Sequence, residues 1–342
     1  MNAALAVAAP KSLELSETMQ AVAQSGYGGT EVFSFGPIPR PRIAANEVLV
    51  RVESAGLDRG TWHMMSGRPY LMRLMGFGFS RPKQLVPGFD VAGTVVEVGA
   101  AVTRFKVGDE VFGMAKGSYA EFGAALETKL AKKPAALSFD QAAVLGISGI
   151  TALAALDKVG PVGPGTKVLI IGASGGVGTY AVQQAKALGA HVTGVSSKSK
   201  TDLVRSLGAD VALDYTSDDF TDGSVQYDAI LDLGGNTSVA RLRRALKPEG
   251  TLAFVGGEHG GDYTAGFERQ LWSMMLAPFT KQKFAMVMAN EHFEPLERLA
   301  ALAEEGKLKP AIDRSFSLEQ VPEAMGALVA GTVRGKIVIK VR

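Results

Sequence analysis

The chain has 342 residues, of which 46% are hydrophobic and 20% are charged, a composition typical of compact globular domains. Thirty-six Lys and Arg residues against 34 Asp and Glu residues leave a formal charge of +2, and no basic run is dense enough to follow a phosphate backbone, so nucleic acid is not an expected partner. The absence of cysteine excludes disulfides, thiolate catalysis and zinc held by cysteine.

Residues 1–18 are rich in alanine but carry no leading basic region, and Pro10 and Lys11 interrupt their apolar run. We expect this segment to be an N-terminal extension outside the folded domains. No apolar run approaches the roughly 20 residues that span a bilayer, so the sequence predicts a protein without membrane segments. A cytoplasmic location is the default expectation.

The first part of the chain, from residue 19 to about 135, consists of short β-rich segments separated by glycine and proline. Examples are EVLVRVESAG (47–56) and VAGTVVEVG (91–99), and their spacing predicts a small barrel-like β unit. The period then changes in SFDQAAVLGISGITALAAL (138–156), where apolar residues recur at helical spacing after Ser138, a candidate N-cap.

The central part alternates strand and helix patterns. KVLII (167–171), HVTGVS (191–196), YDAILDL (227–233) and TLAFVGG (251–257) are strand-like, and helix-like segments separate them, which predicts a doubly wound parallel sheet. The tail from residue 308 offers a strand, a helix capped from Ser317 and a final strand that return to the β unit. We therefore expect three parts: 1–18, a β domain of 19–140 with 307–342, and a nucleotide-binding domain of 141–306.

The motif GASGGVG follows the first strand of the central part and places Gly172, Gly175 and Gly178 at the start of a helix. Glycine is needed there because the turn is tight and a pyrophosphate approaches the backbone closely, while the free N–H groups of the helix bind the anion. An ordinary strand-to-helix turn would account for a lone glycine loop, but its position in a βαβ unit favours a dinucleotide site.

The second strand of this unit ends in Ser196 and Ser197, where a site that prefers NAD carries an acid for the ribose 2′-hydroxyl. Lys198 and Lys200 follow. Hydroxyl and ammonium groups can donate to a 2′-phosphate that a carboxylate would repel, so the sequence predicts NADPH. The alternative is that the lysines are solvated residues of a helix start.

Together these segments resemble the medium-chain dehydrogenase/reductase superfamily, in its zinc-independent quinone oxidoreductase branch. The resemblance rests on PGFDVAGTVVEVG, VTRFKVGDEVFG, AAVLGISGITALAAL, the glycine-loop unit through GVSS, LGADVALDY and the closing GKIVI. It implies an α/β architecture with a GroES-like β-barrel catalytic domain, a Rossmann domain with a doubly wound parallel sheet, and a cofactor in the cleft between them.

The resemblance also locates the positions at which zinc enzymes of the superfamily hold their metal. Asp58 and Ile147 stand at the two cysteine positions, and Phe89 replaces the histidine while Asp90 keeps an acid. It therefore implies no metal site. The same resemblance assigns cofactor contacts to residues across the chain: Thr151, Ser174, Gly175, Gly176, Val177, Lys200, Tyr215, Gly256, Gly257 and Lys336. Arg334 and Lys336 reach the pyrophosphate in this interpretation, or are surface charges.

Two side chains are candidates for the chemical step. Asp58 should face the nicotinamide if the alignment holds, although it could equally pair with Arg59 or fix a loop. Tyr119 is a phenol near the expected cleft and a candidate proton donor. His63 is a weaker candidate, since a lone histidine is more often a structural hydrogen-bonding residue.

Two apolar blocks, GRPYLMRLMGFGFSRPKQLVPG (67–88) and FERQLWSMMLAPFT (267–280), could line a cleft for a flat or hydrophobic substrate, or pack between domains or subunits. KFAMVMA (283–289) is a candidate edge strand for a homodimer.

The sequence thus predicts an NADPH-dependent oxidoreductase that reduces quinones or α,β-unsaturated carbonyls without zinc. The alternatives are a zinc-free NADP-dependent alcohol dehydrogenase or ketone reductase, and a non-catalytic NADPH-binding protein of structural or regulatory function, as zeta-crystallins suggest by resemblance.

Overall fold

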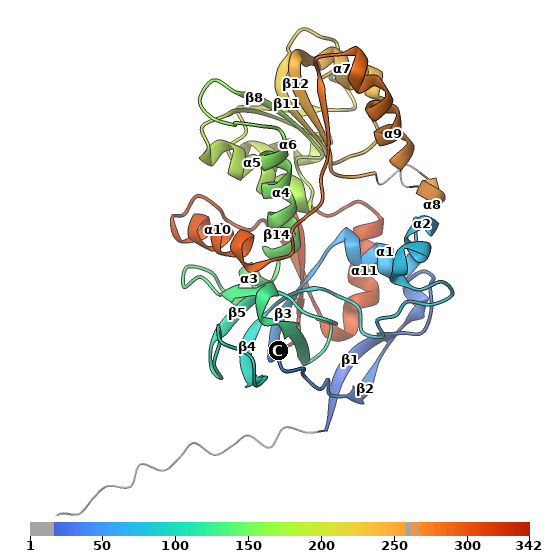
Figure 1. The fold of residues 1–342 in the computed structure, drawn as a ribbon, viewed down its shortest axis with the longest axis vertical. Coiled ribbons are helices and arrows are strands. Elements are labelled where there is room, and N and C mark those ends of the chain that lie inside the picture. The colour runs from blue at the N-terminus through green and yellow to red at the C-terminus, as the bar shows by residue number, and fades with distance from the viewer. Residues whose placement is uncertain (1–16, 258–260, 265) are drawn as a thin grey trace, which may run out of the picture.

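The computed structural model describes residues 17–257, 261–264 and 266–342, so most of the expected extension 1–18 lies outside the described residues. Two β-sheets of different type stand one above the other in Figure 1, with helices α3 (Phe139–Ala143) and α4 (Gly146–Lys158) at their junction. The architecture is the expected α/β combination of a GroES-like sheet domain and a Rossmann-type parallel sheet.

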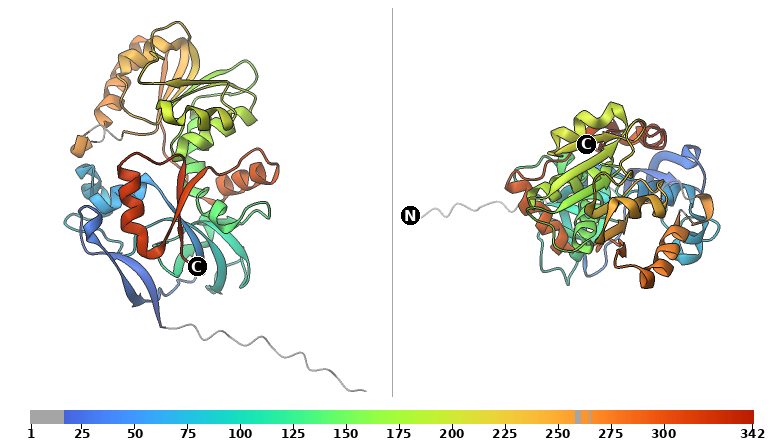
Figure 2. Two further views of the ribbon diagram at one scale, coloured as in Figure 1. Left: turned by 180° about the vertical axis from the view of Figure 1, so that it is seen from behind. Right: turned by 90° about the horizontal axis from the view of Figure 1, so that it is seen from above.

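The lower sheet has seven described strands, ordered β14, β15, β3, β4, β5 and β7 with β6 paired to β3. Its strands are β3 (Glu47–Leu57), β4 (Asp90–Val98), β5 (Glu110–Met114), β6 (Phe122–Leu126), β7 (Leu130–Lys132), β14 (Ile312–Ser317) and β15 (Lys336–Lys340). A separate antiparallel pair is formed by β1 (Thr18–Gln24) and β2 (Phe33–Pro39). Seen from behind, the C-terminal strands lie beside those of the first third of the chain (Figure 2), because β15 pairs antiparallel with β3.

The upper sheet is parallel throughout its six described strands, in the order β10, β9, β8, β11, β12, β13. Its strands are β8 (Lys167–Ile171), β9 (His191–Ser196), β10 (Val211–Asp214), β11 (Tyr227–Asp232), β12 (Leu246–Phe254) and β13 (Lys283–Met286). The strand order reverses between β8 and β11, and ligands of open α/β sheets bind outside the carboxyl ends of the strands at such a point.

The remaining described helices connect and cover these sheets. They are α1 (Arg59–Ser66), α2 (Tyr70–Met72), α5 (Gly176–Ala187), α6 (Thr201–Ser206), α7 (Val239–Ala245), α8 (Gly261–Thr264), α9 (Phe267–Leu276), α10 (Phe293–Glu304) and α11 (Val321–Val329). Short 3₁₀ or π turns lie at Thr30–Val32, Arg73–Phe77, Glu127–Lys129, Lys198–Lys200, Ala277–Phe279 and Leu318–Gln320. None of the helices in the described ranges is long and apolar enough to cross a membrane.

One apolar core runs through both sheets. Phe112 of β5, Leu145 and Ile150 at α4, and Val168 of β8 belong to the same buried cluster. Continuous burial of this kind disfavours free movement of the lower sheet against α4, because separating them would expose apolar surface to water. The core therefore fixes α4 as the wall between the two sheets.

Two predicted helix starts are confirmed. Ser138 accepts a hydrogen bond from the N–H of Gln141 and Ser317 forms a capping box with Gln320, as short polar side chains do at N-caps. The segment after Ser138 is nevertheless two helices rather than one, since α3 ends at Ala143 and α4 begins at Gly146. Ser317 caps a 3₁₀ turn that leads into α11.

A candidate cofactor cleft

A cleft of about 460 Å³ opens at the predicted position, where the carboxyl ends of β8, β11 and β12 face the lower sheet. It gathers most of the residues that the sequence singled out: Asp58, Thr151, Gly172, Ser174, Gly175, Gly176, Val177, Gly178, Lys200, Gly256, Gly257 and Lys336. A larger depression of about 840 Å³ lies outside, between α5, α6 and residues 306–313, but no part of the glycine loop lines it.

The glycine loop has the close packing that its sequence predicts. Gly172 has a φ of +84°, a conformation that side chains disfavour. A Cβ on Gly178 would lie 2.1 Å from the carbonyl oxygen of Gly172, so only glycine fits there. Helix α5 begins at Gly176 without a side-chain cap, and its first N–H groups are available to an anion. These residues therefore fit a dinucleotide pyrophosphate.

Lys200 is a half-buried ammonium in the wall of the cleft. Its Nζ donates to the carbonyl oxygens of Gly331 and Val333, both at 2.8 Å, and burial lowers the pKa of its ammonium. Two of its three N–H groups are used in this way, which leaves one for a ligand. Lys200 is thus more than a solvated residue of a helix start.

The other residues proposed for the 2′-phosphate lie beside the cleft rather than in its wall. Ser196 is buried at the end of β9, where its Oγ donates to the carbonyl of Ser197, and Ser197 Oγ lies 3.4 Å from Ser199 Oγ. Tyr215 is 60% exposed, and its N–H donates to the carbonyl of Ser196. The hydroxyls are therefore close to Lys200 in the chain but bonded locally.

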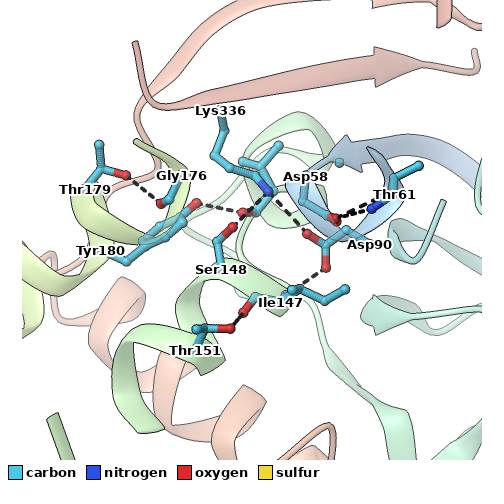
Figure 3. A network of polar contacts seen from close by, with 12 residues as sticks. Asp58, Thr61, Asp90, Ile147, Ser148, Thr151, Gly176, Thr179, Tyr180 and Lys336 are labelled. Atoms are coloured by element: carbon cyan, nitrogen blue, oxygen red, sulfur yellow. Dashed lines mark hydrogen bonds and ion pairs between the residues drawn. The ribbon is translucent and has the colours of Figure 1, made fainter. Parts of the chain in front are cut away.

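The floor of the cleft holds a buried ion pair (Figure 3). Lys336 begins β15, and the register of Ile337 opposite Leu57 brings it to the end of β3. Its Nζ lies 3.0 Å from Ser148 Oγ on α4 and 3.5 Å from Asp90 Oδ2 on β4. Both charged side chains are almost fully buried, at 2% and 0% exposure, so Lys336 is not a surface charge.

The other carboxylate oxygen of Asp90, Oδ1, accepts a hydrogen bond at 2.7 Å from the N–H of Ile147. This bond joins the lower sheet to the start of α4. Burial raises the pKa of Asp90 to about 7, and the Asp58 carboxylate adds to the rise, while Lys336 and the Ile147 N–H oppose it. Two buried phenols, Tyr119 and Tyr180, also face this carboxylate and have raised pKa values because of burial.

Only one of the two carboxylate oxygens of Asp58 accepts a hydrogen bond. Its Oδ1 accepts from the N–H of Thr61 at 2.9 Å and so caps α1, which is the loop-fixing role that the sequence left open. Its Oδ2 is buried and has no hydrogen-bond partner among the described residues, and Asp58 lines the cleft. The side chain therefore lines the cleft while its unsatisfied acceptor lies buried behind the cleft surface.

Tyr119 does not fit the role of proton donor to the cleft. It is fully buried in the core of the lower domain, where its hydroxyl donates to the carbonyl of Gly56 at 3.2 Å. Burial raises the pKa of the phenol well above its ordinary value, so the proton stays on the oxygen. The tyrosine packs behind the site instead of lining it.

Other sequence expectations are placed elsewhere in the structure. Arg334 is a surface charge that pairs with Asp202 at 2.6 Å, and His63 lines the cleft while its Nδ1 lies 2.7 Å from the carbonyl oxygen of Arg68. Neither apolar block supplies a described side chain to the cleft wall.

The sequence analysis missed several residues of the cleft wall. Ser148 lies one helical turn before Thr151 on α4, and that spacing could have revealed it. Leu233 and Gly234 follow β11 as Gly256 and Gly257 follow β12, so the same strand-end argument applied to them. The C-terminal segment contributes Gly331, Val333 and Gly335, and no local sequence pattern predicts that they line the cleft.

The comparisons with known proteins agree with this geometry. Residues 44–190 match the model of the alcohol dehydrogenase GroES-like domain, and residues 207–339 match that of zinc-binding dehydrogenases. A chloroplastic quinone oxidoreductase of Triphysaria versicolor is 33% identical over 94% of this chain and 98% of its own length. The chain belongs to the medium-chain dehydrogenase/reductase superfamily, in its quinone oxidoreductase-like branch. It is an oxidoreductase of that type.

Two further members of the superfamily bear on chemistry. The 2-methylene-furan-3-one reductase of Solanum lycopersicum is 32% identical over 96% of this chain and 80% of its own length. The structure of mycobacterial Rv1454c, solved in complex with NADPH, superimposes with a TM-score of 0.81 at 28% identity, covering 94% of this chain and all of that one. These relatives bind a nicotinamide cofactor or reduce small molecules; the cytoplasmic location stays a prediction.

The superfamily positions for catalytic zinc do not fit a metal here. Phe89 and Ile147 offer hydrocarbon, Asp58 uses one oxygen as a helix cap, and the neighbouring Asp90 is paired with the Lys336 ammonium. Within the described ranges no group of three His, Cys, Asp or Glu side chains could hold a metal ion. The residues at these positions therefore do not fit the zinc binding that the description of the matched family, zinc-binding dehydrogenase, implies.

The raised pKa of Asp90 predicts a pH-dependent stability. A carboxyl whose pKa is higher in the folded state than in the unfolded chain contributes fully below about pH 4 and loses that contribution as the pH rises through about 7. We expect the free energy of unfolding of the wild type, relative to Asp90→Asn, to fall between pH 4.5 and pH 8. Urea unfolding at several pH values measures this.

The Asn variant is a matched control because its amide oxygen can still accept from the N–H of Ile147 but does not titrate. Parallel pH profiles for the two proteins would contradict the assignment. If the wild type instead loses more stability than Asp90→Asn as the pH falls, the pKa of Asp90 is lowered in the folded state rather than raised.

Proposed function

We propose that this protein is an NADPH-dependent oxidoreductase that transfers hydride to quinones or α,β-unsaturated carbonyls without zinc. The observation that carries the proposal is a single cleft with the glycine loop and Lys200 at one end and Asp58, free of a metal donor set, at the other. The names of the quinone oxidoreductase and furanone reductase relatives support the substrate class, and the NADPH complex of Rv1454c supports the cofactor.

The cofactor end is assigned from charge and backbone geometry. The N-terminus of α5 receives the pyrophosphate, and Lys336 lies beside it, since a Cβ on Gly176 would be 3.1 Å from the Lys336 Cδ. Lys200 in the cleft wall favours the 2′-phosphate over a bare ribose, and the end of β9 at Ser196 and Ser197 carries no carboxylate that would repel it. Gly256 and Gly257 place main-chain atoms next to the nicotinamide half of the cofactor.

The reacting end must align two flat groups rather than polarise a carbonyl with a metal. Bound NADPH supplies a hydride, and a quinone or enone already has an electron-poor carbon to accept it. The reduction also consumes one proton from solvent or a side chain. Asp58 lines this end of the cleft, and its unpaired Oδ2 lies buried behind the wall, where it can hold a proton. Thr151 and Ile147 complete the wall beneath it.

The substrate class is tested by presenting a quinone, an enone, a plain ketone and a primary alcohol to the purified protein. We expect NADPH oxidation with the quinone or the enone at least about a hundredfold faster, in kcat/KM, than with the ketone, because only activated acceptors react without Lewis-acid help. Absorbance at 340 nm measures each rate.

Faster turnover of the ketone or the alcohol would favour the alcohol dehydrogenase or ketone reductase alternative. Tight NADPH binding without oxidation across the whole panel would favour a structural or regulatory NADPH-binding protein. The wild type treated with a chelator is the control, and its rates should not change.

The cofactor assignment is tested by Ser196→Asp, which adds a carboxylate where NAD-preferring sites have one. We expect the KM for NADPH to rise about tenfold or more and the preference to move toward NADH, since the new charge repels the 2′-phosphate. Steady-state kinetics with both cofactors measures the change. Lys200→Met should weaken the binding of NADPH and leave that of NADH unchanged.

Ser206→Asp is the matched control, because it adds the same charge to α6 outside the cleft. If Ser196→Asp keeps the wild-type preference for NADPH, the assignment of the 2′-phosphate to the end of β9 is wrong.

We also propose that two copies pair along β13. This strand is the edge of the parallel sheet, as the sequence predicted, and Val287 donates back to Phe254 of β12. Successive N–H groups alternate in direction, so that of Met286 points to the open edge. Exposed apolar side chains surround the strand: Leu271, Trp272, Met274, Met275, Phe279, Met286 and Met288. Such a patch with an open edge fits a symmetric interface.

Met286→Pro removes the outward N–H and keeps the pairing with β12. We expect sedimentation velocity to show a dimer for the wild type and a monomer, or a much weaker dimer, for this variant. Val211→Ala, in the edge strand β10 on the opposite side of the sheet, is the control and should remain dimeric. A monomeric wild type at micromolar concentration contradicts the proposal.

A further inference from the structure

Arg269 is a half-buried arginine on α9 that the sequence analysis did not single out and that does not line the cleft. Its guanidinium makes three bonds to the segment that follows β11. It donates to Asp232 Oδ2 at 2.6 Å, to the carbonyl of Gly235 at 2.7 Å and to that of Thr237 at 2.5 Å. It also lies 5.6 Å from the ring of Phe254 in β12.

Asp232 connects this arginine to the carboxyl ends of two strands. The carboxylate is fully buried, and its Oδ1 accepts from the N–H of Gly235 at 3.0 Å. Its main-chain carbonyl accepts from the N–H groups of Val255 and Gly256, at 3.0 and 3.2 Å. The loops after β11 and β12 therefore meet at one residue, and Arg269 neutralises its buried charge.

The loop held by Asp232 packs against the other walls of the cleft. A Cβ on Gly256 would lie 2.2 Å from the carbonyl oxygen of Leu233, and one on Gly172 would lie 3.3 Å from Leu233 Cβ and 3.4 Å from the nitrogen of Gly234. Three segments of the cleft wall are thus in contact through Leu233 and Gly234. A displacement of this loop would shift the glycine loop and the residues after β12 together.

We infer that Arg269 is a positioning residue for the nicotinamide cofactor, and that it sets cofactor affinity by holding residues 232–237 against Gly172 and Gly256. The inference rests on the proposed cofactor site. A guanidinium suits the task because its planar fork donates in several directions at once, whereas a lysine ammonium on a flexible stem cannot reproduce this geometry. Cofactor affinity is then linked to a helix that does not touch the cofactor.

The test compares Arg269→Met and Arg269→Lys with the wild type in the absence of any acceptor. Titration of NADPH fluorescence should show the Kd rising about tenfold or more for Arg269→Met, and less for Arg269→Lys, because charge-assisted bonds to the loop are lost. With an acceptor, the KM for NADPH should rise by the same factor, while kcat at saturating NADPH stays within about twofold.

Arg241→Met is the matched control, since Arg241 lies in the same domain and pairs with Asp219 at 2.7 Å and Thr221 at 2.9 Å, away from the cleft. It should lower the melting temperature without changing the NADPH Kd. Equal Kd values for Arg269→Met and the wild type, or an equal rise in Arg241→Met, would overturn the inference.

Two further comparisons distinguish a failure of the positioning role from a failure of the proposed function. Arg269→Lys keeps the buried Asp232 paired with a cation, so it reports on affinity even if Arg269→Met does not fold. A wild type that binds neither NADPH nor NADH would refute the proposed function itself. A wild type that binds NADPH, together with an unaffected Arg269→Lys and Arg269→Met, would refute only the positioning role.

Discussion

The burial of the Lys336 side chain between α4 and β4 is the constraint on which the cleft depends. A charge taken out of water costs several kcal/mol unless a partner and hydrogen bonds compensate for it. Lys336 finds its partners on α4 and β4, which are far from it in the chain. The last strand must therefore return to the first sheet, next to α4, before the charge is compensated. The same contacts place Ser148 and the start of α4 beside the glycine loop.

The cofactor half of the site could be predicted from the sequence because its determinants are local. A glycine loop, a strand before it and a helix after it are contiguous, and steric exclusion at Gly172 and Gly178 requires glycine whatever the rest of the fold does. Ser138 and Ser317 were predictable for the same reason, since an N-cap acts within three residues.

The rest of the site depends on contacts between distant segments, which no local pattern encodes. Tyr119 was expected at the cleft because its segment is near the site, yet it lies in the connection between β5 and β6, where its phenol is buried in the core. Lys336 and Arg334 are two residues apart and looked equivalent, but β15 buries the first, while the second lies outside the strand and pairs with Asp202 at the surface. Arg269 was missed because its partners, Asp232 to Thr237, follow another strand.

The polar groups at the reacting end are nearly all committed to the protein itself. Asp90 accepts from the N–H of Ile147, Ser148 accepts from Lys336, and the Thr151 hydroxyl donates to the carbonyl of Ile147 at 2.7 Å. Two buried carboxylate oxygens among the described residues, Asp58 Oδ2 and Asp90 Oδ2, have no hydrogen-bond partner, and the second lies 3.5 Å from Lys336 Nζ. A site of this kind offers alignment rather than strong polarisation. The proposed substrates bring their own electron-poor carbon, so they need alignment more than polarisation.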